Sequence, residues 1–209
     1  TEIAPSTVDL LLPSGAEKLD YVLYTDESPY KMQREWLDRL PFDVHSVNVH
    51  TGAKQLIGRS YRTAPKWSVN GKWAVMYDPI AQVWNKFDGA TGKVINISDA
   101  IGYPMFVENY DKPAPAPAYG IAGWTADGNT VFLYDAYDWW KIDLAGECQP
   151  ECLTKGYGRK HGKSIRKMTS NIDKDVFQKD ETIMVSLWDK DTMDEGVYQL
   201  DMKGRLRKL

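Results

Sequence analysis

Two segments of this chain are alike at an offset of 57 in residue number: WSVNG at positions 67–71 returns as WTADG at positions 124–128. In both, a tryptophan (Trp67 or Trp124) opens the segment and a glycine (Gly71 or Gly128) closes it. A period of this length, made of short strand-like segments and glycine turns, is typical of β-propeller blades and not of a helical solenoid. Because one blade cannot bury both of its faces alone, the repeat predicts the architecture of the whole chain.

Beyond these segments, a first pair of matching residues keeps the offset of 57, and a later pair has an offset that is two residues smaller. Tyr77 corresponds to Tyr134 at the offset of 57, since 134 − 77 equals 124 − 67, whereas Phe87 corresponds to Ile142 at an offset of 55. One hairpin of the later unit is therefore expected to be two residues shorter. We predict an all-β fold of about four β-propeller blades, each a four-stranded antiparallel sheet, with the two repeated tryptophans buried at equivalent positions.

Apolar runs bounded by glycine, asparagine and proline turns predict the strands of each unit. The repeat divides the chain into an N-terminal segment, 1–18, and blades at about 19–57, 58–98, 119–154 and 164–209. In the blade at 58–98, the first expected strand ends near 67 and the others span 72–77, 82–88 and 93–97. In the blade at 119–154, two expected strands span 130–134 and 138–143, and the last one ends near 153–154. In the outer blades they span 19–24, 44–49, 54–57, 165–169, 182–187, 196–200 and 205–209, and the first strand of the first blade has no clear candidate.

Residues 26–40 form a long insert between two expected strands of the first blade. Met32, Trp36 and Leu40 recur there every four residues, a spacing that predicts helical character.

The order of strands in a blade decides which loops share a side. The tight turns at Gly71, Gly92, Gly128 and Gly146 are expected on one side of the blades. The irregular segments 26–40, 100–119, 134–138 and 189–195 are expected on the opposite side. Because function usually resides on long loops over a rigid scaffold, the side with the irregular segments is the candidate binding side.

Five residues of these loops are the candidate ligand-binding residues: Glu108, Tyr110, Asp111, Tyr137 and Asp138. Glu108 and Asp111 precede prolines at 113, 115 and 117, which alternate with alanine and favour an extended segment. That segment is either only a spacer, or its carboxylates bind the N-terminal ammonium group of a peptide.

Composition gives no reason to expect nucleic acid or a membrane as a partner. The net charge is −3, and the basic segment 155–167 interleaves only Tyr157 among its lysines and arginines. No apolar run approaches the roughly 18 residues that a membrane helix needs. We expect no cofactor and no metal, since the acidic loop 189–196 does not keep the spacing of a calcium-binding EF-hand.

The two cysteines, Cys148 and Cys152, enclose a short loop. They either form a disulfide in an oxidising compartment or remain free thiols. A metal site is disfavoured because no second pair of cysteines or histidines lies nearby in sequence.

Several blocks of the chain carry a family resemblance. They are YDAYDWWKID at 134–143, LT at 153–154 and GYGRK at 156–160, with PFDV at 41–44, VNV at 47–49, YGIAGWT at 119–125 and GVY at 196–198. With these blocks, residues 19–200 resemble the propeller region of secreted prolyl-oligopeptidase-like (dipeptidyl-peptidase-like) proteins of Bacteroidetes. The resemblance implies seven or eight blades capping an α/β-hydrolase domain with a Ser-Asp-His triad, in a secreted or periplasmic protein. A start at Thr1 without an initiator methionine fits removal of a leader or of an upstream region.

The chain departs from that family in two ways. About four blades are too few to close the usual ring, and GRS at 58–60 and GKS at 162–164 both fail to complete a Gly-x-Ser-x-Gly nucleophile elbow. His45, His50 and His161 offer little material for a triad base. We therefore expect a fragment of a serine-peptidase-like protein that acts as substrate gate and scaffold without catalytic residues of its own.

The expected partners are the missing α/β-hydrolase domain or the remaining blades of the parent protein, together with a peptide ligand. The open edges of the terminal blades also predict a homo-oligomer. The alternative is a stand-alone propeller-like module that binds a protein, peptide or glycan through the loop side.

Overall fold

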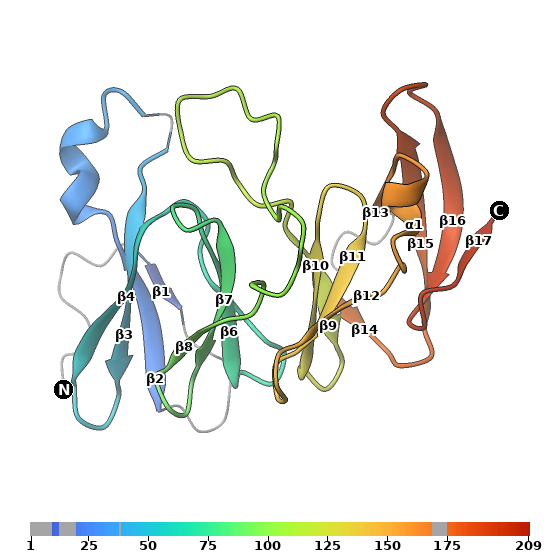
Figure 1. Cartoon of the computed structure of the whole chain (residues 1–209). Helices are drawn as coiled ribbons and strands as arrows, with labels where there is room; N and C mark the ends of the chain where they lie inside the picture. Colours follow the sequence, from blue (N-terminus) through green and yellow to red (C-terminus); the bar gives the residue numbers. More distant parts are fainter. Residues whose placement is uncertain (1–9, 13–19, 38, 169–174) are drawn as a thin grey trace. The chain divides into compact units, whose positions relative to one another are not determined.

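The chain folds into short strands joined mostly by tight hairpins (Figure 1). The computed structural model describes residues 10–12, 20–37, 39–168 and 175–209. These residues belong to two compact units. Unit 1 takes the described residues up to Asp99 together with Lys112–Pro117, and unit 2 takes Ala100–Asp111 with the described residues from Ala118 onward.

Unit 1 contains two four-stranded antiparallel sheets whose strands follow one another in sequence order. The first sheet is β1 (Leu10–Leu12), β2 (Tyr21–Asp26), β3 (Phe42–Asn48) and β4 (Lys54–Tyr61). The second sheet is β5 (Lys66–Trp67), β6 (Trp73–Asp78), β7 (Val83–Asp88) and β8 (Val94–Asn96). A 3-10 helix, η1 (Ser28–Gln33), lies between β2 and β3.

Unit 2 contains the third and fourth sheets. The third is β9 (Ile121–Thr125), β10 (Thr130–Tyr134), β11 (Trp139–Asp143) and β12 (Pro150–Cys152), with β14 (Val176–Phe177) added beside β9. The fourth is β13 (Lys163–Lys167), β15 (Thr182–Asp189), β16 (Glu195–Asp201) and β17 (Leu206–Lys208). A single-turn helix, α1 (Tyr157–Lys160), precedes β13. The prediction of an all-β chain built of four-stranded antiparallel blades is confirmed.

The second and third sheets share one strand register, as the repeat predicts. Trp67 pairs with Ala74, and Trp124 pairs with Val131, so both members of the pair shift by the same offset of 57 in residue number. Because the same strand pairing occurs in both sheets, the repeat in the sequence corresponds to a repeat in the structure.

The predicted shortening by two residues falls in the hairpin between the second and third strands. Tyr77 pairs with Trp84 in one sheet, and Tyr134 pairs with Trp139 in the other. The separations are 84 − 77, or 7, and 139 − 134, or 5.

The turn between the first two strands is also built in the same way twice. The hydroxyl group of Ser68 or Thr125 accepts a hydrogen bond from the amide that opens the following strand, at 3.2 and 3.0 Å. Gly71 and Gly128 both have φ of 67°, a left-handed conformation that is costly for residues with a Cβ atom. The repeated sequence therefore encodes a repeated turn.

The fifth strand of the third sheet was not predicted. β14 pairs in parallel with β9, and the backbone N–H of Trp124 donates to the carbonyl of Asp175 at 2.7 Å. A Cβ atom on Gly123 would lie 2.7 Å from that carbonyl oxygen and 2.5 Å from the Phe177 ring, so only glycine admits the added strand. The equivalent residue of the second sheet, at the same offset of 57, is Lys66.

The repeated tryptophans are not equally buried, which corrects the prediction. Trp124 is 5% exposed, whereas Trp67 is half-buried and donates from Nε1 to the carbonyl of Leu12 at 2.9 Å. The segments of the chain that surround the two tryptophans differ, although the strand pairing of the two tryptophans is the same. Burial at this position is therefore decided by what packs over the strand.

The insert in the first sheet has helical character over η1 only. Met32 and Trp36 are 86% and 77% exposed, whereas Leu40 is buried, and both Trp36 and Leu40 lie beyond the end of η1, so the spacing of four residues marks no buried helical face. A 3-10 turn repeats every three residues, and residues four apart do not share a side of it. The insert is instead attached through the hydroxyl group of Tyr30, which donates to Asp43 at 2.5 Å.

The first strand of the first sheet, for which the sequence has no clear candidate, is β1, inside the segment expected to precede the blades. Its Leu12 pairs with Leu23 of β2. The remaining residues of segment 1–18, and Leu19 and Thr169 at the ends of two expected strands, lie outside the described residues.

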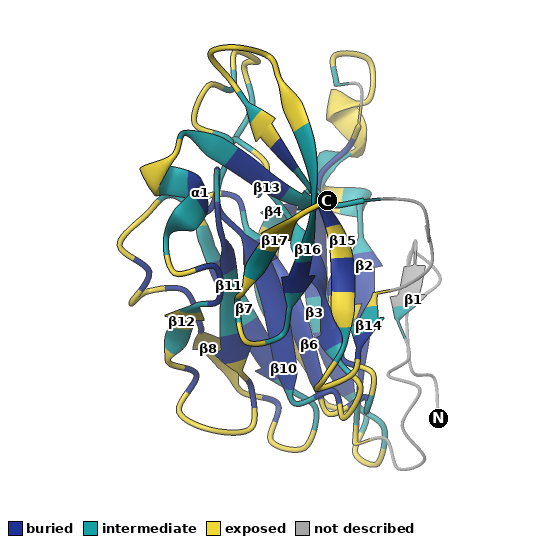
Figure 2. Cartoon of the chain, turned by 90° about the vertical axis from the view of Figure 1, so that its right-hand side faces the viewer, coloured by how far each residue is buried: buried dark blue, intermediate teal, exposed yellow. Residues whose placement is uncertain are grey.

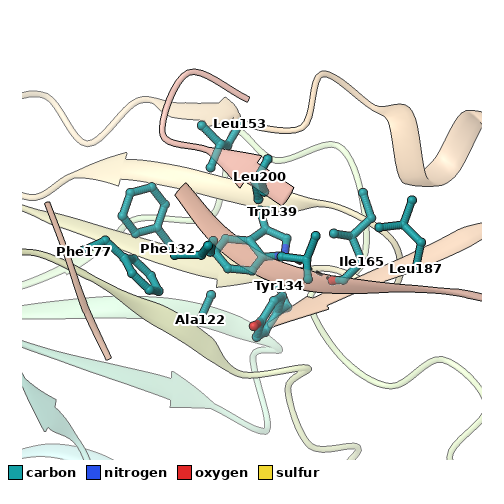
Figure 3. Close-up of a cluster of buried hydrophobic side chains, with 11 residues drawn as sticks. Ala122, Phe132, Tyr134, Trp139, Leu153, Ile165, Phe177, Leu187 and Leu200 are labelled. Carbon is teal, nitrogen blue, oxygen red and sulfur yellow. Dashed lines mark hydrogen bonds between the residues drawn. The ribbon is translucent and has the colours of Figure 1, made fainter. Parts of the chain in front are cut away.

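The core of unit 2 is centred on Trp139, which is fully buried between the third and fourth sheets. Phe132, Tyr134 and Phe177 surround its indole, with ring centroids 5.1 to 6.4 Å away (Figure 3). The indole Nε1 donates to the carbonyl of Ile165 at 3.1 Å, so its one polar atom is satisfied. This contact fixes the two sheets of unit 2 against each other.

The two faces of the fourth sheet differ. Buried and exposed residues alternate along β15 (Figure 2), with Val185 and Leu187 in the core and Met184 and Trp188 each 36% exposed.

No helix in the described part of the chain is long and apolar enough to cross a membrane.

Candidate functional site

Unit 2 holds an open pocket of about 370 Å³. Its walls come from the segment 100–111, the hairpin residue Asp138, the strands β11 and β12, and the turn that contains α1. The lining residues are Tyr103, Asp138, Trp140, Cys152, Gly156, Arg159 and Lys160. Because Tyr103 lies far in sequence from the rest, the pocket exists only in the folded unit.

Asp135 organises the inner wall although it is fully buried. One carboxylate oxygen accepts the backbone N–H groups of Tyr137 and Asp138 at 2.7 and 2.6 Å. The other accepts Nη2 of Arg159 at 3.0 Å and Nε1 of Trp140 at 3.1 Å. A buried carboxylate needs this many donors, and here they also fix two residues of the pocket wall.

Asp138 shapes the turn that carries α1. Its Oδ1 accepts the Thr154 hydroxyl group at 2.6 Å and the Gly158 N–H at 2.8 Å, and its Oδ2 accepts the Arg159 N–H at 2.9 Å. A Cβ atom on Gly158 would lie 2.6 Å from the carbonyl oxygen atoms of both Tyr137 and Lys163. The glycine in the middle of GYGRK therefore lets α1 approach the hairpin closely.

Arg159 stands between the buried carboxylate and the open pocket. Its guanidinium lies 3.7 Å from the centroid of the Tyr103 ring, and 28% of its side chain is exposed. Among the described residues Nε of Arg159 is buried with no hydrogen-bond partner, and Lys160 forms no ion pair. The two neighbouring cations therefore retain donors that can face a ligand.

Arg166 lies deeper behind the same hairpin. Its guanidinium donates to the carbonyls of Asp135 at 2.7 Å, Ala136 at 3.2 Å and Ile165 at 2.8 Å. Burial lowers its pKa, and the nearby charges of Tyr134 and Asp135 oppose that shift. Its role is to stabilise the hairpin from within.

The thiol of Cys152 forms part of the pocket wall. Its Sγ accepts the N–H of Gly156 at 3.2 Å, and burial is the main reason that the pKa of this thiol is raised. Cys148 is buried, and both cysteines are free thiols in the structure. A disulfide between the two cysteines stays a prediction.

The predicted ligand-binding residues fall into two groups. Asp138 is part of the pocket wall, with its oxygens already bonded within the protein, and the ring of the adjacent Tyr137 lies outside the lining, 5.1 Å from the Arg159 guanidinium. Glu108 lies on the segment that carries Tyr103 and donates its N–H to the Tyr119 hydroxyl group at 3.4 Å. Tyr110 and Asp111 belong to the same segment, outside the pocket lining. Ligand binding by these five residues stays a prediction.

Sequence reasoning missed Asp135, Trp140, Arg159 and Lys160 as site residues. The signal was present, because these residues lie inside the blocks YDAYDWWKID and GYGRK that carry the family resemblance. Tyr103 had no comparable signal. It is distant in sequence from Arg159, and only the fold brings the two side chains together.

Three of the six lysines and arginines in the basic segment 155–167 are paired with carboxylates. Arg159 bonds Asp135, Lys163 lies 3.5 Å from Asp189, and Lys167 lies 2.6 Å from Asp175. Lys160 is the exposed exception at the pocket.

The acidic loop 189–196 is a hairpin turn. Asp189 accepts the N–H groups of Asp191 at 3.0 Å and Thr192 at 3.2 Å, and these bonds lower the pKa of its carboxyl group. Within the described ranges, no group of three His, Cys, Asp or Glu residues is arranged to hold a metal ion.

No protein-family model and no curated protein sequence matches the chain. Among solved structures it is similar to a putative TolB from Agrobacterium tumefaciens, with 11% identity and a TM-score of 0.44 over 90% of this chain and 60% of that one. It is similar to a puromycin-hydrolyzing peptidase of Mycobacterium tuberculosis, with 15% identity and a TM-score of 0.46 over 93% of this chain and 29% of that one. It is also similar to the β-propeller domain of the Trilobed protease from Pyrococcus furiosus, with 12% identity and a TM-score of 0.36 over 97% of this chain and 70% of that one. Likeness at this distance bears on the fold alone, and the chain spans less than two thirds of the TolB chain.

Proposed function

We propose that this chain is the propeller portion of a larger, secreted or periplasmic protein of the prolyl-oligopeptidase-like kind found in Bacteroidetes. In that protein the blades act as a scaffold and substrate gate for an α/β-hydrolase domain. The proposal joins the block resemblance of the sequence to the blades and the pocket of the structure.

The observation that carries the proposal is the open face of the fourth sheet. One face of this sheet packs on the third sheet through Val185 and Leu187, and the other exposes Met184 and Trp188. A propeller blade is normally covered on both faces, because each blade packs on the next. The exposed face is therefore the place where a further blade of the same protein packs.

The gating part of the proposal is supported by the pocket beside α1. It is bounded by the irregular segments of unit 2, whereas the sheets below it are regular and share a packed core. Variable loops on a rigid β-scaffold are the usual way in which such folds select a ligand.

The histidines fit a non-catalytic role for this chain. His45 stacks on Tyr24 at 4.9 Å between ring centroids, and His50 pairs with Asp20 at 3.1 Å. His161 packs on the Tyr157 ring at 4.4 Å. Each histidine is thus engaged with a group other than a serine or cysteine nucleophile.

The same pocket also favours the second candidate function, a stand-alone module that binds a protein, peptide or glycan. The coding sequence downstream of Leu209 distinguishes the two candidates. A reading frame that continues into further blades and a Gly-x-Ser-x-Gly elbow supports the gate and scaffold. A stop codon directly after Leu209 contradicts it and supports the module.

A biochemical test uses fluorophosphonate labelling. We expect the 209-residue chain to show no serine labelling and no turnover of peptide p-nitroanilides. The longer protein that contains it should show both. Labelling of a serine in the isolated chain would overturn the proposed role.

A further test addresses the open face of the fourth sheet. We expect the isolated chain to self-associate through that face, and the double substitution Met184→Lys and Trp188→Lys to shift it toward monomer in sedimentation equilibrium. Replacing Lys179 and Lys203, which lie at another hollow of unit 2, by glutamine is the control. A strict monomer before any substitution would argue against an uncovered blade.

A further inference from the structure

The charged groups at the pocket beside α1 have a net positive charge. Asp135 and Asp138 both lie at its inner side, but each is saturated by donors from the protein. Arg159 and Arg166 balance these two carboxylates in charge. Lys160 is then the surplus charge, so the five groups sum to +1.

The cations of the pocket can present donors in a defined plane. The guanidinium of Arg159 stacks on Tyr103 at 3.7 Å and is fixed by the buried Asp135, so its orientation is set before any ligand arrives. A stacked guanidinium keeps its N–H groups in the plane of the fork, which matches the two oxygens of a carboxylate. The Nε of Arg159 has no hydrogen-bond partner in the part of the chain that the structure describes.

The remaining walls are apolar and aromatic. Tyr103 is 44% exposed, and its ring centroid is 6.2 Å from that of the half-buried Trp140. At Gly156 an added Cβ atom would meet no heavy atom within 4 Å, so this wall leaves room for a ligand. A pocket of about 370 Å³ accepts a group considerably larger than a free inorganic anion.

We propose that this pocket binds one carboxylate group together with the apolar or aromatic group next to it, as presented by a peptide. Arg159 and Lys160 bind the carboxylate, and Tyr103 and Trp140 contact the neighbouring side chain. One surplus positive charge matches a carboxylate, which carries a single negative charge, better than a phosphate dianion. The inference rests on the proposed function only in taking the ligand to be a peptide, and it holds for the gate and for the stand-alone module.

The first experiment compares matched peptides. N-acetyl-Ala-Phe presents a free C-terminal carboxylate, and N-acetyl-Ala-Phe-amide lacks it. N-acetyl-Glu-Phe-amide presents the carboxylate on a side chain. Binding to the whole chain is followed by NMR titration of the Arg159 Nε–H and Trp140 Nε1–H resonances. We expect both carboxylate peptides or one of them to bind at least about fivefold more tightly than the amide, an effect of one charge-assisted hydrogen bond at a half-exposed site. The tighter of the two identifies the source of the carboxylate.

A second readout uses the thiol in the wall. Iodoacetamide at pH 8.5 is expected to alkylate Cys152, and a bound carboxylate peptide should slow that alkylation in proportion to its occupancy. Buried Cys148 is the internal control for unfolding, because it reacts only when the unit opens.

The matched variants are Lys160→Gln and Lys203→Gln. Both lysines are exposed, but Lys203 lines a different hollow of unit 2. We expect Lys160→Gln to weaken carboxylate binding by about threefold to tenfold, and Lys203→Gln to leave it unchanged. Equal binding of acid and amide, equal effects of the two lysine variants, or tighter competition by inorganic phosphate than by the peptide would each overturn the inference. None of these results depends on the reading frame after Leu209 or on fluorophosphonate labelling. The proposed function and this inference are therefore tested by separate experiments.

Discussion

The hairpins at Asp78 and Asp135 occupy the same place in two blades of one repeat, but among the described residues their aspartates have different partners. Both begin with an aspartate that accepts two backbone N–H groups: Asp78 binds those of Ile80 and Ala81, each at 2.9 Å. Asp135 makes the equivalent bonds and then uses its second oxygen to hold Arg159 and Trp140. The repeat thus supplies the turn, and the side chains bound to the second oxygen line the pocket.

The shorter hairpin also changes where the aspartate lies. In the second sheet the loop is two residues longer and exposes Ile80, whereas in the third sheet Asp135 is fully buried. The two-residue difference at the end of a blade thus accompanies a half-buried carboxylate in one hairpin and a fully buried one that binds Arg159 of α1 in the other. Loops of equal position in a propeller can therefore differ in function while the sheets below them stay equivalent.

The largest expected difference between the two blades concerns the repeated tryptophans. Trp124→Ala should lower the free energy of unfolding by about 3–5 kcal/mol, the range for deleting a buried aromatic side chain. Trp67→Ala should cost about 2 kcal/mol, because the side chain is only half-buried. Denaturant unfolding of each variant measures both values, and equal losses would show that burial does not separate the two positions.

The two hairpin aspartates should differ next. Asp135→Ala leaves the Arg159 guanidinium and the Trp140 indole without their acceptor, and we expect a loss of about 3 kcal/mol. Asp78→Ala removes only a turn cap and should cost about 1 kcal/mol. Asp135→Asn keeps an acceptor for the turn and should fall between them. If thermal or denaturant unfolding gives the same loss for both alanine variants, the second oxygen of Asp135 contributes nothing.

A smaller contrast concerns the tryptophans that come after these hairpins. The Nε1 of Trp139 donates to Ile165, whereas the Nε1 of Trp84 is buried with no hydrogen-bond partner among the described residues. Trp139→Phe should therefore cost about 1–2 kcal/mol, and Trp84→Phe about 0.5 kcal/mol or less, because it also removes an unsatisfied donor. The order would be reversed if a partner reaches Trp84 in solution, and unfolding curves of the two phenylalanine variants decide it.

The smallest expected effect is a pH dependence at the repeated turn. Asp127 occupies the place of Asn70, and hydrogen bonds from Thr125 and Asn129 lower the pKa of its carboxyl group from 3.8. Because the folded-state pKa is the lower one, its contribution to stability is present above about pH 4 and is lost as the pH falls below that. This side chain is exposed, so the effect should stay below about 1 kcal/mol.

The variant Asp127→Asn tests this with the residue that the second sheet already uses. We expect wild type to be slightly more stable than the variant at pH 6, and the difference to shrink as the pH falls below about 4 toward pH 3. A difference that is constant between these two pH values would assign the effect to the amide itself.

Much of the scaffold can be predicted from local sequence. The strands that contain Trp73 and Phe132 are short, mostly apolar runs that are buried almost throughout, and such runs between turn residues can be recognised without a distant partner. The glycines at 71 and 128 fix the turns that precede them. The offset of 57 and its slip to 55 determined the register of two sheets and the length of one hairpin.

The rest was decided by contacts between residues far apart in the chain. The short strand β14 joins β9 only because Gly123 leaves room for Phe177, and the pocket needs Tyr103 to reach Arg159. Trp67 and Trp124 have similar neighbours in sequence, but their side chains are buried to different extents. Strand pattern and turn chemistry act over a few residues and can be read from the sequence. Burial, charge pairing and pocket shape depend on which segments the fold brings together, and only the tertiary structure determines them.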